Sequence, residues 1–456
     1  MKISQNRVAS PALLLFLSSA CVLQFLPFLQ GYYLTADDVL FQYYGYTQTA
    51  QDWLAIGWDT ALWKSKLGEF ISIPIMVLGN LNIDSLLIRV LNILVFLGSA
   101  LLFALWVKER ITPQVALLFA LLFIAMTPLR FFHMPPTSYP LFPSIQIIVL
   151  LSCLLLIKKF HGAVRILAAI GCLLAMLSSE YTLLLGGALI LFELIRDARS
   201  IRLLNRDIRV WIAIAALAGH LVVRNVLGTG DYTEVSAEMR LDKVLSIVAY
   251  HSLNGTVLGP ADFPIRFDFL QPLDYARSAL CALFVSSVAY IITGQVKTDQ
   301  TPSPVLSLVT LSLIIMLALT VPIALLPKYQ AWCSSPKACA YLDSRYAGWA
   351  VMLIFIPVVQ FGMRKLSRWL IAPIIGAVAL ITSLQNGATM QRMDKTLEPW
   401  RLAQVSLCES TSSWETFLES DQANSIPFHA TPDRTRRDYW NVWARNVTCA
   451  HLNRYS

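Results

Sequence analysis

Long apolar stretches recur along the chain, separated by short polar turns. A stretch of roughly 20 apolar residues can cross a bilayer as a helix, because every backbone polar group then bonds within the helix. The pattern predicts an all-α polytopic membrane protein with about eleven transmembrane helices. We place these helices at 10–30, 85–107, 112–127, 140–157, 164–179, 181–195, 210–227, 276–294, 304–326, 346–362 and 369–385.

The composition supports this class of protein. The chain is 56% hydrophobic and 14% charged, whereas soluble domains carry about 25% charged residues. The first apolar run continues past Cys21 to Leu29, which favours an uncleaved first helix over a signal peptide. The net charge of +8 does not indicate a nucleic-acid partner, because much of the excess Lys and Arg lies in short turns between the predicted helices.

The distribution of basic residues predicts how the chain is oriented. With the N-terminus in the cytoplasm, alternate turns face inward, and each contains Lys or Arg, as the positive-inside rule requires. Three long segments then face outward: a first external loop, a second large external loop and a C-terminal tail. The predicted domains are a transmembrane domain at 1–385, which includes the loops 31–84 and 228–275, and the external tail at 386–456.

Four cysteines fall on the side predicted to be external: Cys333, Cys339, Cys408 and Cys449. An oxidising compartment favours disulfides, and the spacings match no zinc motif. We therefore expect the disulfides Cys333–Cys339 and Cys408–Cys449.

Two adjacent carboxylates, Asp37 and Asp38, follow the first predicted helix in the stretch "GYYLTADDVLFQYYG". Carboxylates beside a bilayer are costly unless they are hydrated, paired or functional. The simplest alternative is that one of them only caps the next helix. The segment 37–70 is amphipathic and rich in aromatic residues, which predicts helices that lie along the membrane surface and hold both carboxylates at a fixed depth.

Further ionisable residues lie at the external ends of the predicted helices. Taken singly, each has an ordinary explanation, such as a helix cap or a side chain that reaches lipid headgroups. Taken together, they describe acids and bases that converge on one external site for a lipid phosphate. They are Arg130, His133, Glu180, Arg224, Lys328 and Arg345.

Three local patterns occur in a fixed order along the chain. An acidic pair, Asp37-Asp38, follows the first helix; Ser178-Ser179-Glu180 ends a middle helix; and Arg345-Tyr346 begins a late one. In this order the chain resembles the GT-C superfamily of membrane glycosyltransferases, although many members have Lys where Ser179 stands. It also resembles the O-antigen glucosyltransferases of bacteria and phages, which act in the periplasm.

The resemblance implies a GT-C-like fold in the bacterial inner membrane, with the active site facing the periplasm. It implies a polyprenyl-phosphate-sugar donor, a glycan acceptor such as O-antigen, and contact with the lipid bilayer. It also implies that Asp37 and Asp38 are the catalytic residues, one of them the general base, and that Arg345 binds the donor phosphate. Which aspartate is the base is open at this stage; the resemblance favours Asp37, with Asp38 adjusting its pKa or binding a metal. The other substrate-binding candidates are Glu180, Tyr346, Arg130, His133, Lys328 and Arg224.

The chemistry explains why one base suffices. A phosphate ester leaves as a stable anion, so only the acceptor hydroxyl needs a proton acceptor, and cations must lie where the phosphate charge develops. A single displacement inverts the anomeric centre. No cofactor is certain. A divalent metal could relieve the repulsion within the Asp pair, but no cluster has the spacing of a metal site.

Other functions remain open at this point. A transporter or lipid flippase would place ionisable residues near the middle of the bilayer and show repeated halves. The acids here gather at one face, and no repeat is visible. An O-antigen polymerase or ligase would use large external loops with arginines, without an early acidic pair. A non-catalytic assembly protein is the last alternative.

Overall fold

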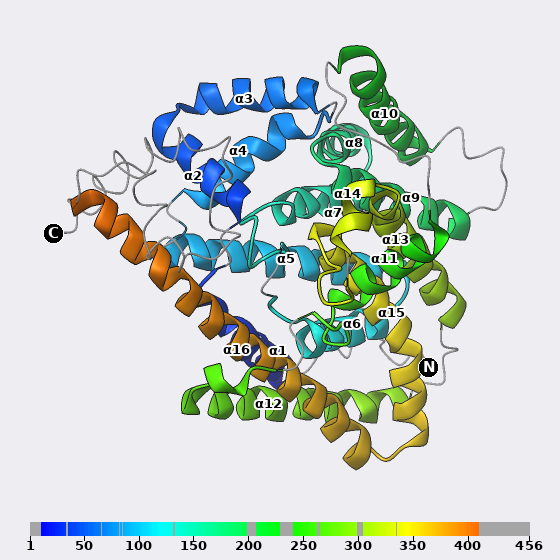
Figure 1. Ribbon diagram of the computed structural model, residues 1–456. Coiled ribbons are helices and arrows are strands. Elements are labelled where there is room, and N and C mark those ends of the chain that lie inside the picture. The colour runs from blue at the N-terminus through cyan, green and yellow to red at the C-terminus, as the bar shows by residue number, and fades with distance from the viewer. Residues whose placement is uncertain are drawn as a thin grey trace.

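In the computed structural model, helices make up most of the part of the chain that the structure describes (Figure 1). All the elements that the structure describes are helical, which confirms the predicted all-α class. The described residues are 11–32, 35–64, 66–81, 83, 85–130, 133–197, 207–228, 240–261, 265–298, 304–333 and 335–409.

Each of the eleven predicted transmembrane segments coincides with a helix. Two of these helices end in a short 3-10 or π-helical turn, η1 and η3. They are α1 Pro11–Phe25 with η1 Leu26–Leu29, α5 Leu86–Arg110, α6 Pro113–Met126, α7 Ser144–Lys159, α8 Gly162–Leu177, α9 Glu180–Asp197, α10 Ile208–Val222 with η3 Val223–Leu227, α12 Pro272–Thr298, α13 Val305–Ala324, α15 Leu342–Lys365 and α16 Arg368–Glu409.

Within the described residues, seven helical segments are long and apolar enough to cross a membrane. This finding supports a multi-pass membrane protein. The other four helices at predicted positions are α6, α7 and α8, which have only 14, 16 and 16 residues, and α9, which is more highly charged. The seven segments are 11–29, 86–110, 208–227, 272–294, 305–324, 342–365 and 368–395.

The remaining helices lie in the predicted external loops. The first loop holds three helices that pack on one another at one side of the molecule (Figure 1). Thr35 and Asp38 form a capping box that starts the first of them, and Thr49 and Asp52 form one that starts the second. The three helices of the first loop are α2 Ala36–Thr47, α3 Ala50–Trp63 and α4 Glu69–Asn80. The helices of the other predicted external loops are α11 Leu241–Asn254, η4 Phe267–Phe269 and α14 Pro327–Trp332.

Aromatic side chains from several helices fill the middle of the helical body. Phe103 of α5 lies between Phe119 of α6 and Trp349 of α15, with ring centroids 5.0 and 4.7 Å apart. Elsewhere small residues allow closer contact. A Cβ on Gly255 would lie 2.0 Å from the carbonyl oxygen of Ser344, so only glycine lets the end of α11 approach α15 this closely.

Helix α16 is longer than the sequence pattern predicted. It packs along α12 (Figure 1) and continues unbroken past residue 385 to Glu409. Asn386, Met390 and Met393 are buried, so the first part of the predicted tail belongs to the helical core. The predicted disulfide Cys333–Cys339 is present, whereas Cys408–Cys449 lies outside the described residues because Cys449 is not among them.

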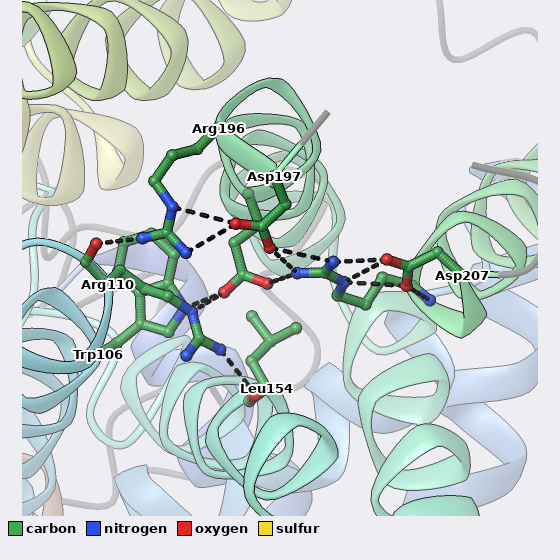
Figure 2. A network of polar contacts seen from close by, with 8 residues as sticks. Trp106, Arg110, Leu154, Arg196, Asp197 and Asp207 are labelled. Carbon is green, nitrogen blue, oxygen red and sulfur yellow. Dashed lines mark hydrogen bonds and ion pairs between the residues drawn. The ribbon is translucent and has the colours of Figure 1, made fainter. Parts of the chain in front are cut away.

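A buried ion-pair network joins α5, α9 and α10 (Figure 2). Glu193 of α9 is at its centre and accepts hydrogen bonds from Arg110 of α5 and Arg209 of α10. The indole nitrogen of Trp106 donates a further hydrogen bond to Glu193, at 3.0 Å. The carboxylate is 1% exposed, so its charge is balanced inside the protein. The network lies at the ends of the helices that we predict to be cytoplasmic.

We expect Glu193→Gln to lower the stability of the folded protein by about 3–5 kcal/mol, because it leaves two guanidinium groups without their shared anion. The side chain of Asp197 belongs to the same network but is 39% exposed, so Asp197→Asn should cost less than about 1 kcal/mol. Thermal unfolding in detergent measures both changes. Equal effects of the two substitutions would contradict a central role for Glu193.

Candidate functional site

Asp38 is buried at the start of α2, where it closes the capping box. Its carboxylate accepts hydrogen bonds from the backbone nitrogen of Thr35 at 3.1 Å and from the Thr35 hydroxyl at 2.7 Å. The side-chain amide of Asn80 in α4 donates a third, at 3.1 Å. Burial raises the pKa of Asp38 to about 6 even though these three hydrogen bonds oppose the shift. These contacts make Asp38 a residue that fixes α2 against α4.

Asp37, one residue earlier, has a different environment. It is half-buried, and the hydroxyl of Tyr139 donates a hydrogen bond to its carboxylate at 3.3 Å. Burial raises the pKa of Tyr139 well above its usual value, so this phenol stays protonated and remains a donor. Asp37 therefore has the more accessible carboxylate of the pair.

Tyr139 holds an unusual backbone conformation. Its φ of +51° lies in the left-handed region, which is rare for a bulky residue. Such strain persists only where the surrounding structure imposes it, and it often occurs at functional sites. Asn92 of α5 holds this loop, since it donates to the carbonyl of Pro136 at 2.9 Å and accepts from the backbone nitrogen of Leu141 at 3.0 Å.

An aromatic group surrounds the Asp37–Tyr139 contact. The ring of His133 lies 6.3 Å from Tyr139, 6.0 Å from Trp332 and 6.2 Å from Tyr341, centroid to centroid. Burial lowers the pKa of His133 to about 4; the charge of Asp37 opposes this shift and the charge of Lys328 adds to it. His133 is therefore neutral at neutral pH, and it lies within electrostatic range of Asp37.

Lys328 is the exposed cation of this region. Its ammonium group lies 4.7 Å from the centre of the Trp332 ring and 5.9 Å from that of Tyr329. Among the described residues, no salt bridge involves Lys328. An ammonium group held over aromatic faces keeps its donors for a bound anion.

Glu180 is placed at a neighbouring contact between the first loop and α9. Its carboxylate lies 3.0 Å from the ammonium nitrogen of Lys66. The hydroxyl of Ser72 donates to the carbonyl of Ser178 at 2.9 Å, so α4 is fixed to the turn before α9. The sequence pattern did not indicate Lys66, because its partner is more than a hundred residues away.

Arg345 is 1% exposed, and its donors face backbone carbonyls. They bond Pro135 at 2.7 Å, Pro128 at 2.7 Å and Gly255 at 3.3 Å. The guanidinium thus links the loop after α6 to the loop after α11. These contacts favour a structural role over the phosphate-binding role expected from the sequence.

Arg130 and Tyr346 are also buried in structural contacts. The guanidinium of Arg130 is fully buried and bonds carbonyls of the loop 254–261, including that of Thr256 at 2.6 Å. The hydroxyl of Tyr346 lies 2.8 Å from that of Ser144. Arg224 is exposed in η3, which packs near α3. The structure therefore gathers Asp37, His133 and Lys328, while Arg130, Arg345 and Tyr346 support the loops beside them.

Sequence analysis missed three aromatic residues of this group: Tyr139, Trp332 and Tyr341. A signal for Tyr139 was available in "MPPTSYP", since prolines keep this turn out of a helix and a polar aromatic residue ends it. Trp332 and Tyr341 flank the segment that the Cys333–Cys339 disulfide closes, so the disulfide ties both residues to one short segment.

Comparison of the chain with protein-family models, with curated proteins and with solved structures finds no match. The function has to be inferred from the residues of the site.

The pKa of Asp38 predicts a pH dependence of stability. Its folded-state pKa of about 6 exceeds the ordinary value of 3.8, so the folded protein holds this proton more tightly than the unfolded chain. The stabilisation is complete below about pH 4 and is lost as pH rises through about 6, by at most about 3 kcal/mol. Asp38→Asn removes this titration. Melting temperatures in detergent from pH 4 to 7 should fall more steeply for wild type than for the variant, and parallel curves would contradict the assignment.

Proposed function

We propose that the protein is an inverting glycosyltransferase of the inner membrane that moves a sugar from a polyprenyl-phosphate donor to a periplasmic glycan such as O-antigen. The observation that carries the proposal is the grouping of one accessible carboxylate, Asp37, with an aromatic group and an exposed cation, Lys328. Polar groups set among aromatic side chains are typical of small-molecule sites, and apolar sugar faces pack on such rings.

In this reaction Asp37 accepts the proton of the acceptor hydroxyl. The hydroxyl oxygen bonds to the anomeric carbon while the bond from that carbon to the donor phosphate oxygen breaks. The lipid phosphate leaves with the electron pair and needs no proton. Tyr139 orients Asp37 through its hydrogen bond, and Lys328 takes the place that sequence analysis gave to Arg345 as the cation for the phosphate.

The topology supports an external site. We propose that eleven helices cross the membrane, including the short helices α6, α7 and α8 and the more highly charged α9. The disulfide Cys333–Cys339 lies next in sequence to Trp332 of the aromatic group, and disulfides persist in the periplasm but rarely in the cytosol. The disulfide therefore supports a candidate site that faces the periplasm.

We expect Asp37→Asn to reduce sugar transfer by at least about 10²-fold, the lower end of general-base catalysis, because the amide cannot accept the proton. Asp52→Asn is the control, since Asp52 lies in the first turn of the neighbouring helix α3 but is not among the residues around Tyr139. Mass spectrometry of the surface polysaccharide of cells that express each variant measures transfer. Near wild-type glycan with folded Asp37→Asn would refute the proposed base.

Lys328 and Arg345 should respond differently to substitution. Lys328→Met should raise the KM for a polyprenyl-phosphate hexose by about tenfold or more without changing the melting temperature. This effect is smaller than the loss of a buried oxyanion-hole donor, because Lys328 is exposed. Arg345→Lys should lower the melting temperature, because one ammonium cannot replace the guanidinium at three carbonyls. Transfer assays with purified protein and thermal unfolding separate the two roles. If Arg345→Lys is stable and has a raised KM for the donor, then Arg345, and not Lys328, binds the donor phosphate.

A further inference from the structure

Beside the aromatic group, three residues from two segments bring together possible ligand atoms for a metal ion. A ring nitrogen of His251 and the sulfur atoms of Cys333 and Cys339 all lie within 4.8 Å of one another. His251 comes from α11, and the cysteines flank the turn after α14. His251 and Cys339 are 2% and 1% exposed, so both residues are shielded from bulk water.

Asp343, at the start of α15, is the fourth residue at this site and contacts His251. One of its carboxylate oxygens lies 2.8 Å from Nδ1 of His251. The other is buried and has no hydrogen-bond partner among the described residues. A buried carboxylate oxygen without a partner calls for an ion or a water molecule. With Asp343 accepting from Nδ1, the nitrogen lone pair for a metal is on Nε2, and a carboxylate behind a histidine is the usual support of a metal ligand.

The surroundings favour a soft cation. Val244, Ile247 and Ala324 are buried beside the cysteines, and this apolar packing would exclude competing water ligands. Two thiolates and one imidazole are ligands that Zn²⁺ prefers. Hard cations prefer oxygen ligands throughout, so Mg²⁺ and Ca²⁺ do not fit this set.

We propose that His251, Cys333 and Cys339 bind Zn²⁺, with Asp343 supporting His251, when the Cys333–Cys339 disulfide is reduced. A phosphine reductant supplies the electrons in vitro. The S–S bond breaks, two thiols form, and the phosphine takes the oxygen of one water molecule to become its oxide. The metal then displaces the two thiol protons. Disulfide and metal are alternative links across the same segment, and each holds Trp332 and Tyr341 in place.

The test uses the full chain in detergent, with Cys408 and Cys449 replaced by Ser in every sample. The protein is reduced with a phosphine and titrated with Co²⁺, whose thiolate complexes give charge-transfer and tetrahedral d–d absorption bands. We expect both bands to saturate at one Co²⁺ per chain and to disappear when Zn²⁺ is added. The oxidised protein, which has the same sequence, should give neither band. Circular dichroism of each sample verifies its helix content.

Three variants assign the ligands. Cys333→Ser with Cys339→Ser should abolish the charge-transfer band, and His251→Gln should weaken binding. Asp343→Asn should reduce Co²⁺ affinity about 10–100-fold, as for other supporting carboxylates. The proposal is overturned if the reduced protein gives no bands, or if the double cysteine variant keeps them, because the membrane cysteines would then be the ligands. None of these results depends on sugar transfer.

Discussion

The loops after α6 and α11 depend on buried guanidinium groups that satisfy backbone carbonyls. Non-helical backbone at the depth of a membrane is tolerated only where its polar groups find partners inside the protein. Arg345 bonds two carbonyls within the loop after α6, and Arg130 bonds carbonyls of the loop after α11. Together they hold the turn that places Tyr139 against Asp37.

The two adjacent aspartates illustrate how one residue of offset separates two roles. Successive positions on a helix point about 100° apart, so the carboxylate that closes the capping box turns inward and its neighbour does not. Asp38 is 1% exposed and fixes α2 to α4, whereas Asp37 faces Tyr139. The capping explanation of the acidic pair therefore holds for Asp38, and Asp37 is the residue left for the role we propose.

The apolar runs predicted the helices well, because hydrophobic length is a local property of the sequence. The capping role of Asp38 was also readable, since Thr35 and Asp38 have the spacing of a capping box. The roles of Arg130 and Arg345 could not be predicted from the sequence. A cation at the end of a helix has the same sequence pattern whether it bonds a ligand or carbonyls, and the carbonyls around Arg345 come from two loops more than a hundred residues apart in sequence. The contact between His251 and Asp343 was not predicted either, because the two residues are far apart in sequence.

Helix α16 reaches well beyond the hydrocarbon layer. Its 42 residues make a rod about 63 Å long at 1.5 Å per residue, about twice the roughly 30 Å thickness of that layer. The apolar segment ends near Lys395, so the last turns continue the helix about 20 Å beyond that segment, as far as Glu409. Because the helix is unbroken, it holds Glu409 at a fixed distance from the apolar segment.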